Sequence, residues 1–61
     1  MKNDSLLLDE RAVSVALSVS LATVRRWRYI GGGPRYLKLG ALVRYRREDL
    51  NEWLDRKGVA A

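Results

Sequence analysis

Two helix-start signals stand close together in the first third of this chain, and they restrict the fold more than any other feature. Asp9 and Ser20 both have side-chain oxygens that can accept a hydrogen bond from a free amide in the first turn of a helix. Each lies between two apolar residues at the spacing of a hydrophobic staple. The first helix must therefore end before a link of only a few residues, around Ser18 and Val19. Two short helices joined this tightly predict a helix-turn-helix.

The second predicted helix has one apolar and one basic side. At about 3.6 residues per turn, Val24 and Trp27 lie on the apolar side, with Leu21 beside them. The members of the other side are Ala22, Arg26 and Tyr29, flanked by Thr23 and Arg25. A helix with a small-residue first turn and outward arginines can enter the major groove of DNA, so we predict a recognition helix. The alternative is an αα-hairpin that serves only as scaffold, and the outward arginines argue against it.

The charge of the chain is segregated along the sequence. Residues 11–47 carry nine Lys or Arg and no acid, whereas residues 1–10 and 48–61 each have a net charge of −2. A basic centre between acidic ends is the electrostatic footprint of a protein that binds a polyanion. A surface that is merely soluble would intersperse the two signs.

The first predicted helix presents Val13, Ala16 and Leu17 to the interior. Val15 points outward, where a solvated helix would carry a polar residue. In the turn that follows, helix-turn-helix proteins usually place glycine, and this chain has Ser18. A left-handed backbone conformation there costs a serine roughly 1 kcal/mol.

The middle of the chain predicts a β-hairpin. Gly31 and Pro34 end the second helix, since glycine takes the left-handed position that closes a helix and proline cannot continue one. Residues 36–46 then alternate between apolar and basic. We place the two sets on opposite faces, which requires a three-residue loop over residues 40–42 or a bulge. The apolar set is Leu37, Leu39, Val43 and Tyr45, and the basic set is Lys38, Arg44 and Arg46.

A third helix is expected over residues 47–57. Acidic residues stand in its first turn and basic residues in its last, which suits the helix dipole, and Gly58 stops it. Its apolar stripe is Leu50, Trp53 and Leu54. We expect Trp27 and Trp53 to be the two large core residues and not platforms for stacked bases.

Together these elements predict one α+β domain over residues 1–61: a small winged helix-turn-helix with three short helices and a two-stranded β-hairpin as the wing. We expect flexible ends at residues 1–5 and 58–61. The chain has no cysteine and no histidine, which argues against a disulfide framework, a metal site and a catalytic centre. We expect no cofactor and no enzymatic activity. No apolar run is long enough to span a membrane, so a cytoplasmic protein is the default expectation.

Three motifs follow one another in a characteristic order. They are Ser20-Leu21-x-Thr23-Val24-Arg25-Arg26-Trp27, the Gly-Pro link with its basic hairpin, and Glu48-Asp49-Leu50-x-x-Trp53-Leu54. Their order and spacing, from roughly Leu6 to Leu54, resemble the excisionase-like branch of the MerR-type winged-helix domains. Members of this group include phage and integrative-element excisionases, also called recombination directionality factors.

The resemblance implies a mode of DNA binding. In excisionases the recognition helix reads the major groove, the wing touches the backbone or the neighbouring minor groove, and the bound DNA is bent. The resemblance also implies a partner integrase, which is a tyrosine recombinase that the protein directs toward excision. It implies a location at the nucleoid of a bacterial host. The implied DNA-binding residues are Ser20, Ala22, Thr23, Arg25, Arg26 and Arg28 on the helix, and Lys38, Arg44 and Arg46 on the wing.

Two other functions stay open: a small transcriptional regulator of the AlpA type, and a protein–protein adaptor on the same fold. MerR regulators dimerise through a long C-terminal helix, whereas only residues 58–61 follow the third helix here, which favours a monomer in solution. Val15 and Leu42 are apolar at positions expected to be exposed. We therefore expect adjacent copies on DNA to touch head-to-tail through these two residues.

Overall fold

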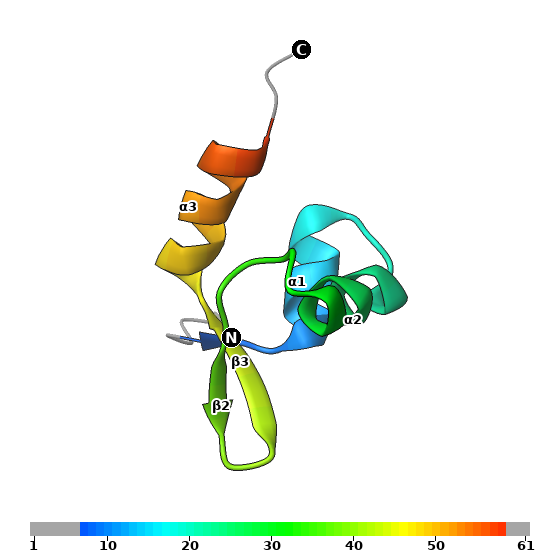
Figure 1. Ribbon diagram of the computed structural model, residues 1–61, viewed down its shortest axis with the longest axis vertical. Helices are drawn as coiled ribbons and strands as arrows, with labels where there is room; N and C mark the ends of the chain where they lie inside the picture. Colours follow the sequence, from blue (N-terminus) through cyan, green and yellow to red (C-terminus); the bar gives the residue numbers. More distant parts are fainter. Residues whose placement is uncertain (1–6, 59–61) are drawn as a thin grey trace, which may run out of the picture.

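The computed structural model describes residues 7–58, which form a small α+β winged helix-turn-helix (Figure 1). The elements are β1 (Leu7–Leu8), α1 (Glu10–Leu17), α2 (Leu21–Ile30), β2 (Leu37–Leu39), β3 (Leu42–Arg46) and α3 (Arg47–Lys57). The hairpin of β2 and β3 extends from one end of the molecule, with α1 and α2 together on one side of it (Figure 1). The predicted fold class is confirmed. Flexible ends were predicted at residues 1–5 and 58–61, and all of these except Gly58 lie outside the described residues.

Both predicted helix caps are present. The carboxylate of Asp9 accepts a hydrogen bond from the N–H of Ala12 at 2.8 Å, and the hydroxyl of Ser20 accepts one from the N–H of Thr23 at 3.1 Å. Between the two helices, Ser18 adopts the left-handed conformation, with φ 57° and ψ 41°. The tight turn is therefore formed, and Ser18 carries the backbone strain that a glycine would avoid.

Helix α1 turns one predicted core residue to solvent. Val13 is fully buried and Leu17 packs against the core, as predicted, but Ala16 is exposed. Ser14 is buried instead, because its hydroxyl donates to the carbonyl of Arg11 at 2.7 Å and leaves no unpaired polar group. The prediction for Ala16 is wrong because a serine that satisfies its own hydroxyl can face the core.

The link after α2 holds the chain close to the end of that helix. Gly31 takes the predicted left-handed position with φ 80°, and the N–H of Gly32 donates to the carbonyl of Trp27 at 3.0 Å. A Cβ atom on Gly33 would lie 2.6 Å from the Cβ of Trp27, so this close approach requires glycine. The link brings Tyr36, just before β2, alongside the outward side of α2.

The hairpin has a two-residue loop, which corrects the predicted register. Leu37 pairs with Arg44, and the successive pairs leave only Gly40 and Ala41 between the strands. Gly40 has a φ of 67°, as the first position of a type II′ turn requires, and Ala41 is not among the residues with positive φ. The prediction of a three-residue loop was wrong. The positive φ that Gly40 can adopt favours a two-residue turn, and this preference outweighs the alternation of apolar and basic side chains.

This register distributes the basic residues over both faces of the hairpin. Directly opposed residues of an antiparallel pair share a face, so Arg44 lies on one face and Lys38, opposite Val43, lies on the other. Arg46 shares the face of Arg44 because alternate residues of a strand point the same way. The same face also carries Leu37, Leu39 and Leu42. The prediction of one apolar and one basic face is therefore wrong.

A third strand completes the sheet, in the order β1–β3–β2. Leu8 of β1 pairs with Tyr45 of β3, and both side chains are buried. The strand β1 has only two residues and lies just before the N-cap of α1.

The two tryptophans join α2 to α3. Their ring centroids are 5.0 Å apart, and the indole N–H of Trp53 donates to the carbonyl of Gly32 at 3.3 Å. The buried core consists of Leu8, Val13, Val24, Tyr45, Leu50 and Trp53, with Trp27 packed against it. The predicted structural role of both tryptophans is confirmed, and α2 is fixed with its basic side outward.

Candidate nucleic-acid interface

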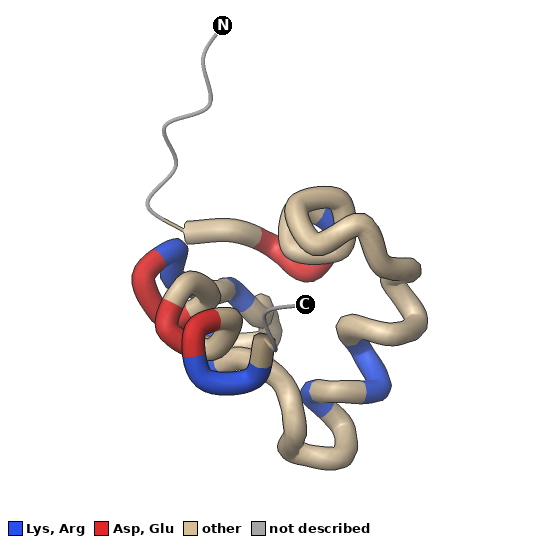
Figure 2. The backbone as a smooth tube through the Cα atoms, turned by 90° about the horizontal axis from the view of Figure 1, so that it is seen from above, with Lys and Arg blue, Asp and Glu red and all other residues tan. Residues whose placement is uncertain are grey.

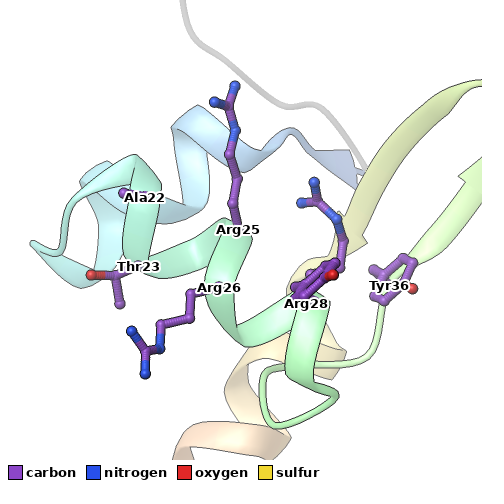
Figure 3. Close-up of a pocket in the computed structure, with 7 residues that line it drawn as sticks. Ala22, Thr23, Arg25, Arg26, Arg28 and Tyr36 are labelled. Carbon is purple, nitrogen blue, oxygen red and sulfur yellow. The ribbon is translucent and has the colours of Figure 1, made fainter.

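An open groove of about 820 Å³ runs along the outward side of α2 to the start of the hairpin (Figure 3). Its lining residues are Ala22, Thr23, Arg25, Arg26, Arg28, Tyr29 and Tyr36. Burial of Val24 on the opposite side of the helix fixes this orientation. The structure therefore brings together all the helix residues that the resemblance implied, apart from Ser20 at the N-cap.

Two of these arginines converge on one acidic residue of α1. Oε2 of Glu10 accepts hydrogen bonds from Nε of Arg25 at 3.1 Å and from its Nη2 at 2.7 Å. Oε1 of Glu10 accepts one from Nη1 of Arg28 at 3.1 Å. Nη1 of Arg28 also donates to the hydroxyl of Tyr45 at 3.4 Å, so Arg28 links the carboxylate to the core.

The cluster remains positively charged because two guanidinium groups face one carboxylate. The hydrogen bond from Arg25 lowers the pKa of Glu10 most; burial of the carboxyl opposes this, and the bond from Arg28 adds to it. Glu10 is therefore ionised at neutral pH. The side chain of Arg25 is 57% exposed and that of Arg28 is 23% exposed. Arg25 is thus the more accessible arginine of the pair, while Arg28 is largely enclosed.

Arg26 occupies a different part of the groove. Its side chain extends away from that of Arg25 (Figure 3) and is exposed. Among residues 7–58, no ion pair joins Arg26 to another side chain. Thr23 lies one turn earlier, and its hydroxyl is 2.9 Å from that of Ser20, which the cap already uses. Arg26 is therefore the groove arginine most available to a ligand.

The three basic residues of the hairpin do not act as one patch. Lys38 is exposed on one face, whereas Arg44 and Arg46 lie on the other. Nη1 of Arg44 donates to the carbonyl of Val43 at 2.8 Å, which holds that side chain along its own strand. The hairpin can therefore present positive charge on both faces.

The acids of α3 lie away from the arginines of α2 (Figure 2), whereas Glu10 of α1 lies among those arginines. Figure 2 shows the acids of α3 on the opposite side of the molecule from the arginines of α2. The sequence predicted acidic ends around a basic centre, and the fold keeps this separation for the C-terminal acids but brings Glu10 against Arg25 and Arg28. A polyanion would therefore approach the α2 side.

Two residues that line the groove, and Glu10 beside it, were not singled out from the sequence as site residues. Tyr29 is 92% exposed on the outward side of α2, where helical periodicity already placed it. Tyr36 borders the groove from the hairpin side, with its ring centroid 6.1 Å from that of Tyr45. Glu10 had been assigned only to the helix dipole, and no local pattern connects it to arginines in the next helix.

The two predicted protein-contact residues are both exposed. The exposed fractions are 74% for Val15 and 53% for Leu42. Leu39, next to Leu42 across the hairpin loop, is 49% exposed as well. The end of the wing is therefore more apolar than the sequence suggested.

Within residues 7–58, no three acidic, histidine or cysteine side chains come together as a metal site would require. In the same part of the chain, no helix has the length and apolar character needed to cross a membrane.

Comparison with known proteins gives one match. A family model described as "Helix-turn-helix domain" matches residues 7–58, which is every residue that the structure describes. No curated protein matches the chain.

Proposed function

This chain belongs to the helix-turn-helix domain family of DNA-binding proteins, and from that premise we propose how it binds. Helix α2 enters the major groove and the hairpin lies along the backbone or in the neighbouring minor groove. The observation that carries the proposal is the open groove beside α2, with three arginines in its lining and the wing at its end. The base-side residues are Ala22, Thr23, Arg25 and Arg26, and the residues on the backbone are Ser20, Lys38, Arg44 and Arg46. Arg28 is largely enclosed and adds to the backbone contact through the 23% of its side chain that stays exposed.

We further propose that the protein is an excisionase of the MerR-like branch. It bends attachment-site DNA of a phage or integrative element and directs a partner integrase, a tyrosine recombinase, toward excision at the nucleoid of a bacterial cell. The support is the order of the sequence motifs together with the small size of the interface. A module with one recognition helix buries about 600–1,000 Å² on DNA, the low end for specific binding, so affinity must come from neighbouring copies.

Contacts between neighbouring copies are proposed through exposed apolar residues. Val15 on α1 and Leu42 at the wing tip lie on separate elements and are both exposed, as a head-to-tail contact requires. Such a contact need not close into a ring, so copies would line up along direct repeats and their bends would add. A two-fold regulator of the AlpA type would favour an inverted repeat.

The test is a titration of the protein on DNA with one binding site and with two or three tandem sites. We expect cooperative filling of tandem sites, and Leu42→Ser should reduce the cooperativity while single-site affinity stays unchanged. Ile30→Ser, which also replaces an exposed apolar residue, is the matched control and should keep the cooperativity. Independent filling of tandem sites, or a stable dimer in free solution by sedimentation, would contradict the array and favour the regulator. A salt dependence of binding with a slope near zero would favour the adaptor, because no phosphate contacts would then be made.

A further inference from the structure

Glu10 lies where it can control how an arginine of α2 meets DNA. It is the first residue of α1, and its side chain is only 26% exposed beside the groove. Its carboxylate receives three guanidinium hydrogen bonds, two from Arg25 and one from Arg28. An acid beside a DNA-binding surface repels phosphate, so its presence there calls for a function that outweighs the repulsion.

The carboxylate is held in place from the interior side of the cluster. Nη1 of Arg28 bonds both Oε1 of Glu10 and the hydroxyl of Tyr45. Tyr45 is 1% exposed and pairs with Leu8 in the centre of the sheet. Through Arg28 the position of Glu10 is therefore tied to a buried residue of the central strand, while Arg25 is bound on its outer side.

The geometry of Arg25 leaves one edge of its guanidinium group for a ligand. Glu10 occupies the side edge, formed by Nε and Nη2. The end edge, formed by Nη1 and the second hydrogen of Nη2, has two parallel donors, and no hydrogen bond within residues 7–58 occupies its Nη1. Two parallel donors match the O6 and N7 acceptors of guanine in the major groove. An arginine held by its side edge also loses less rotamer freedom on binding a base.

We propose that Glu10 is a specificity-determining positioning residue, which holds Arg25 by its side edge so that the end edge reads a guanine in the major groove. This inference rests on the proposed entry of α2 into the major groove. Glu10 itself touches no base and acts through Arg25.

The test separates two properties of residue 10: its negative charge, and the position of its carboxylate relative to Arg25. Glu10→Ala removes both the charge and the contact. Glu10→Asp keeps the charge but shortens the side chain by one methylene, so the carboxylate no longer reaches Arg25. Glu52→Ala, on the exposed side of α3, removes one negative charge away from the groove and is the matched control. Thermal unfolding checks that each variant folds.

The readout is the dissociation constant for a preferred duplex, selected from a randomised pool, and for its single-base-pair variants. We expect wild type to prefer guanine at one position by about 5- to 150-fold, and Arg25→Ala to abolish this preference. Glu10→Ala and Glu10→Asp should lose most of the same preference and no other, while Glu52→Ala keeps it. The double variant Glu10→Ala/Arg25→Ala should show no greater loss than Arg25→Ala alone.

Three results would overturn the inference. Glu10→Asp that behaves as wild type would show that only the charge of Glu10 matters. If Glu10→Ala tightened binding to every duplex by the same factor, Glu10 would act only by repelling the DNA phosphates. Additive losses in the double variant would show that Glu10 acts without Arg25. A wild-type protein with no base preference at all would instead contradict the proposed function on which the inference rests.

Discussion

Ser18 is the residue at which α1 turns into α2, and its φ of 57° is a conformation that serine adopts only at a cost. Glycine would remove about 1–2 kcal/mol of steric strain, offset by roughly 0.5–1 kcal/mol of extra freedom in the unfolded chain. We expect Ser18→Gly to raise the free energy of unfolding by about 0.5–1 kcal/mol, measured by urea denaturation. Ala16→Gly, at an exposed position inside α1, is the control and should lower it by about 1 kcal/mol. Equal destabilisation by both substitutions would rule out the left-handed turn.

At the scale of single residues, the sequence predicts what depends on neighbours along the chain. Asp9 and Ser20 could be identified as caps because a cap bonds an amide only three residues away. Glu10 could not be identified as a partner of Arg25 and Arg28, which follow it by 15 and 18 residues. Those residues meet only when α1 packs on α2, and no local periodicity records that contact.

The two elements that we propose to face DNA, α2 and the hairpin, are expected to make different kinds of contact. Arg26 extends from the exposed side of α2, and Arg26→Ala should weaken binding by about 1–3 kcal/mol and relax the preference at one or two base pairs. Lys38→Ala or Arg44→Ala on the hairpin should weaken binding to all sequences about equally, as the loss of a phosphate contact does. The measurement is the dissociation constant on a preferred duplex and on its single-base variants. A uniform loss of affinity in Arg26→Ala would assign that residue to the backbone and remove its base-reading role.

At the scale of elements, the sequence predicts which helices and strands form better than it predicts which residues lie on which face of them. The bounds of α3 and the caps of α1 and α2 agree with the structure because helical periodicity and caps reinforce each other. The hairpin exists as predicted, but its faces do not, since one residue in the loop exchanges the faces of a whole strand. Gly40 decided the register, and with it the separation of Lys38 from Arg44.

For the molecule as a whole, the decisive property is the separation of charge. A net charge of +5 arises from a basic centre flanked by acidic ends, and the fold keeps the acids of α3 away from the arginines of α2 (Figure 2). The sequence was sufficient for this property because every acidic residue after position 47 falls within the single helix α3. It was not sufficient for the groove, whose shape depends on how the glycine link places Tyr36 beside α2.

The central claim is that the basic side chains of α2 and the hairpin bind the DNA backbone while α2 reads the major groove. The most direct test is the dissociation constant for a duplex, measured over a series of salt concentrations. With about four to six phosphate contacts, the logarithm of the association constant should fall against the logarithm of salt concentration with a slope of about −4 to −5. A slope near zero would contradict the claim, because binding would then release no counterions from the DNA.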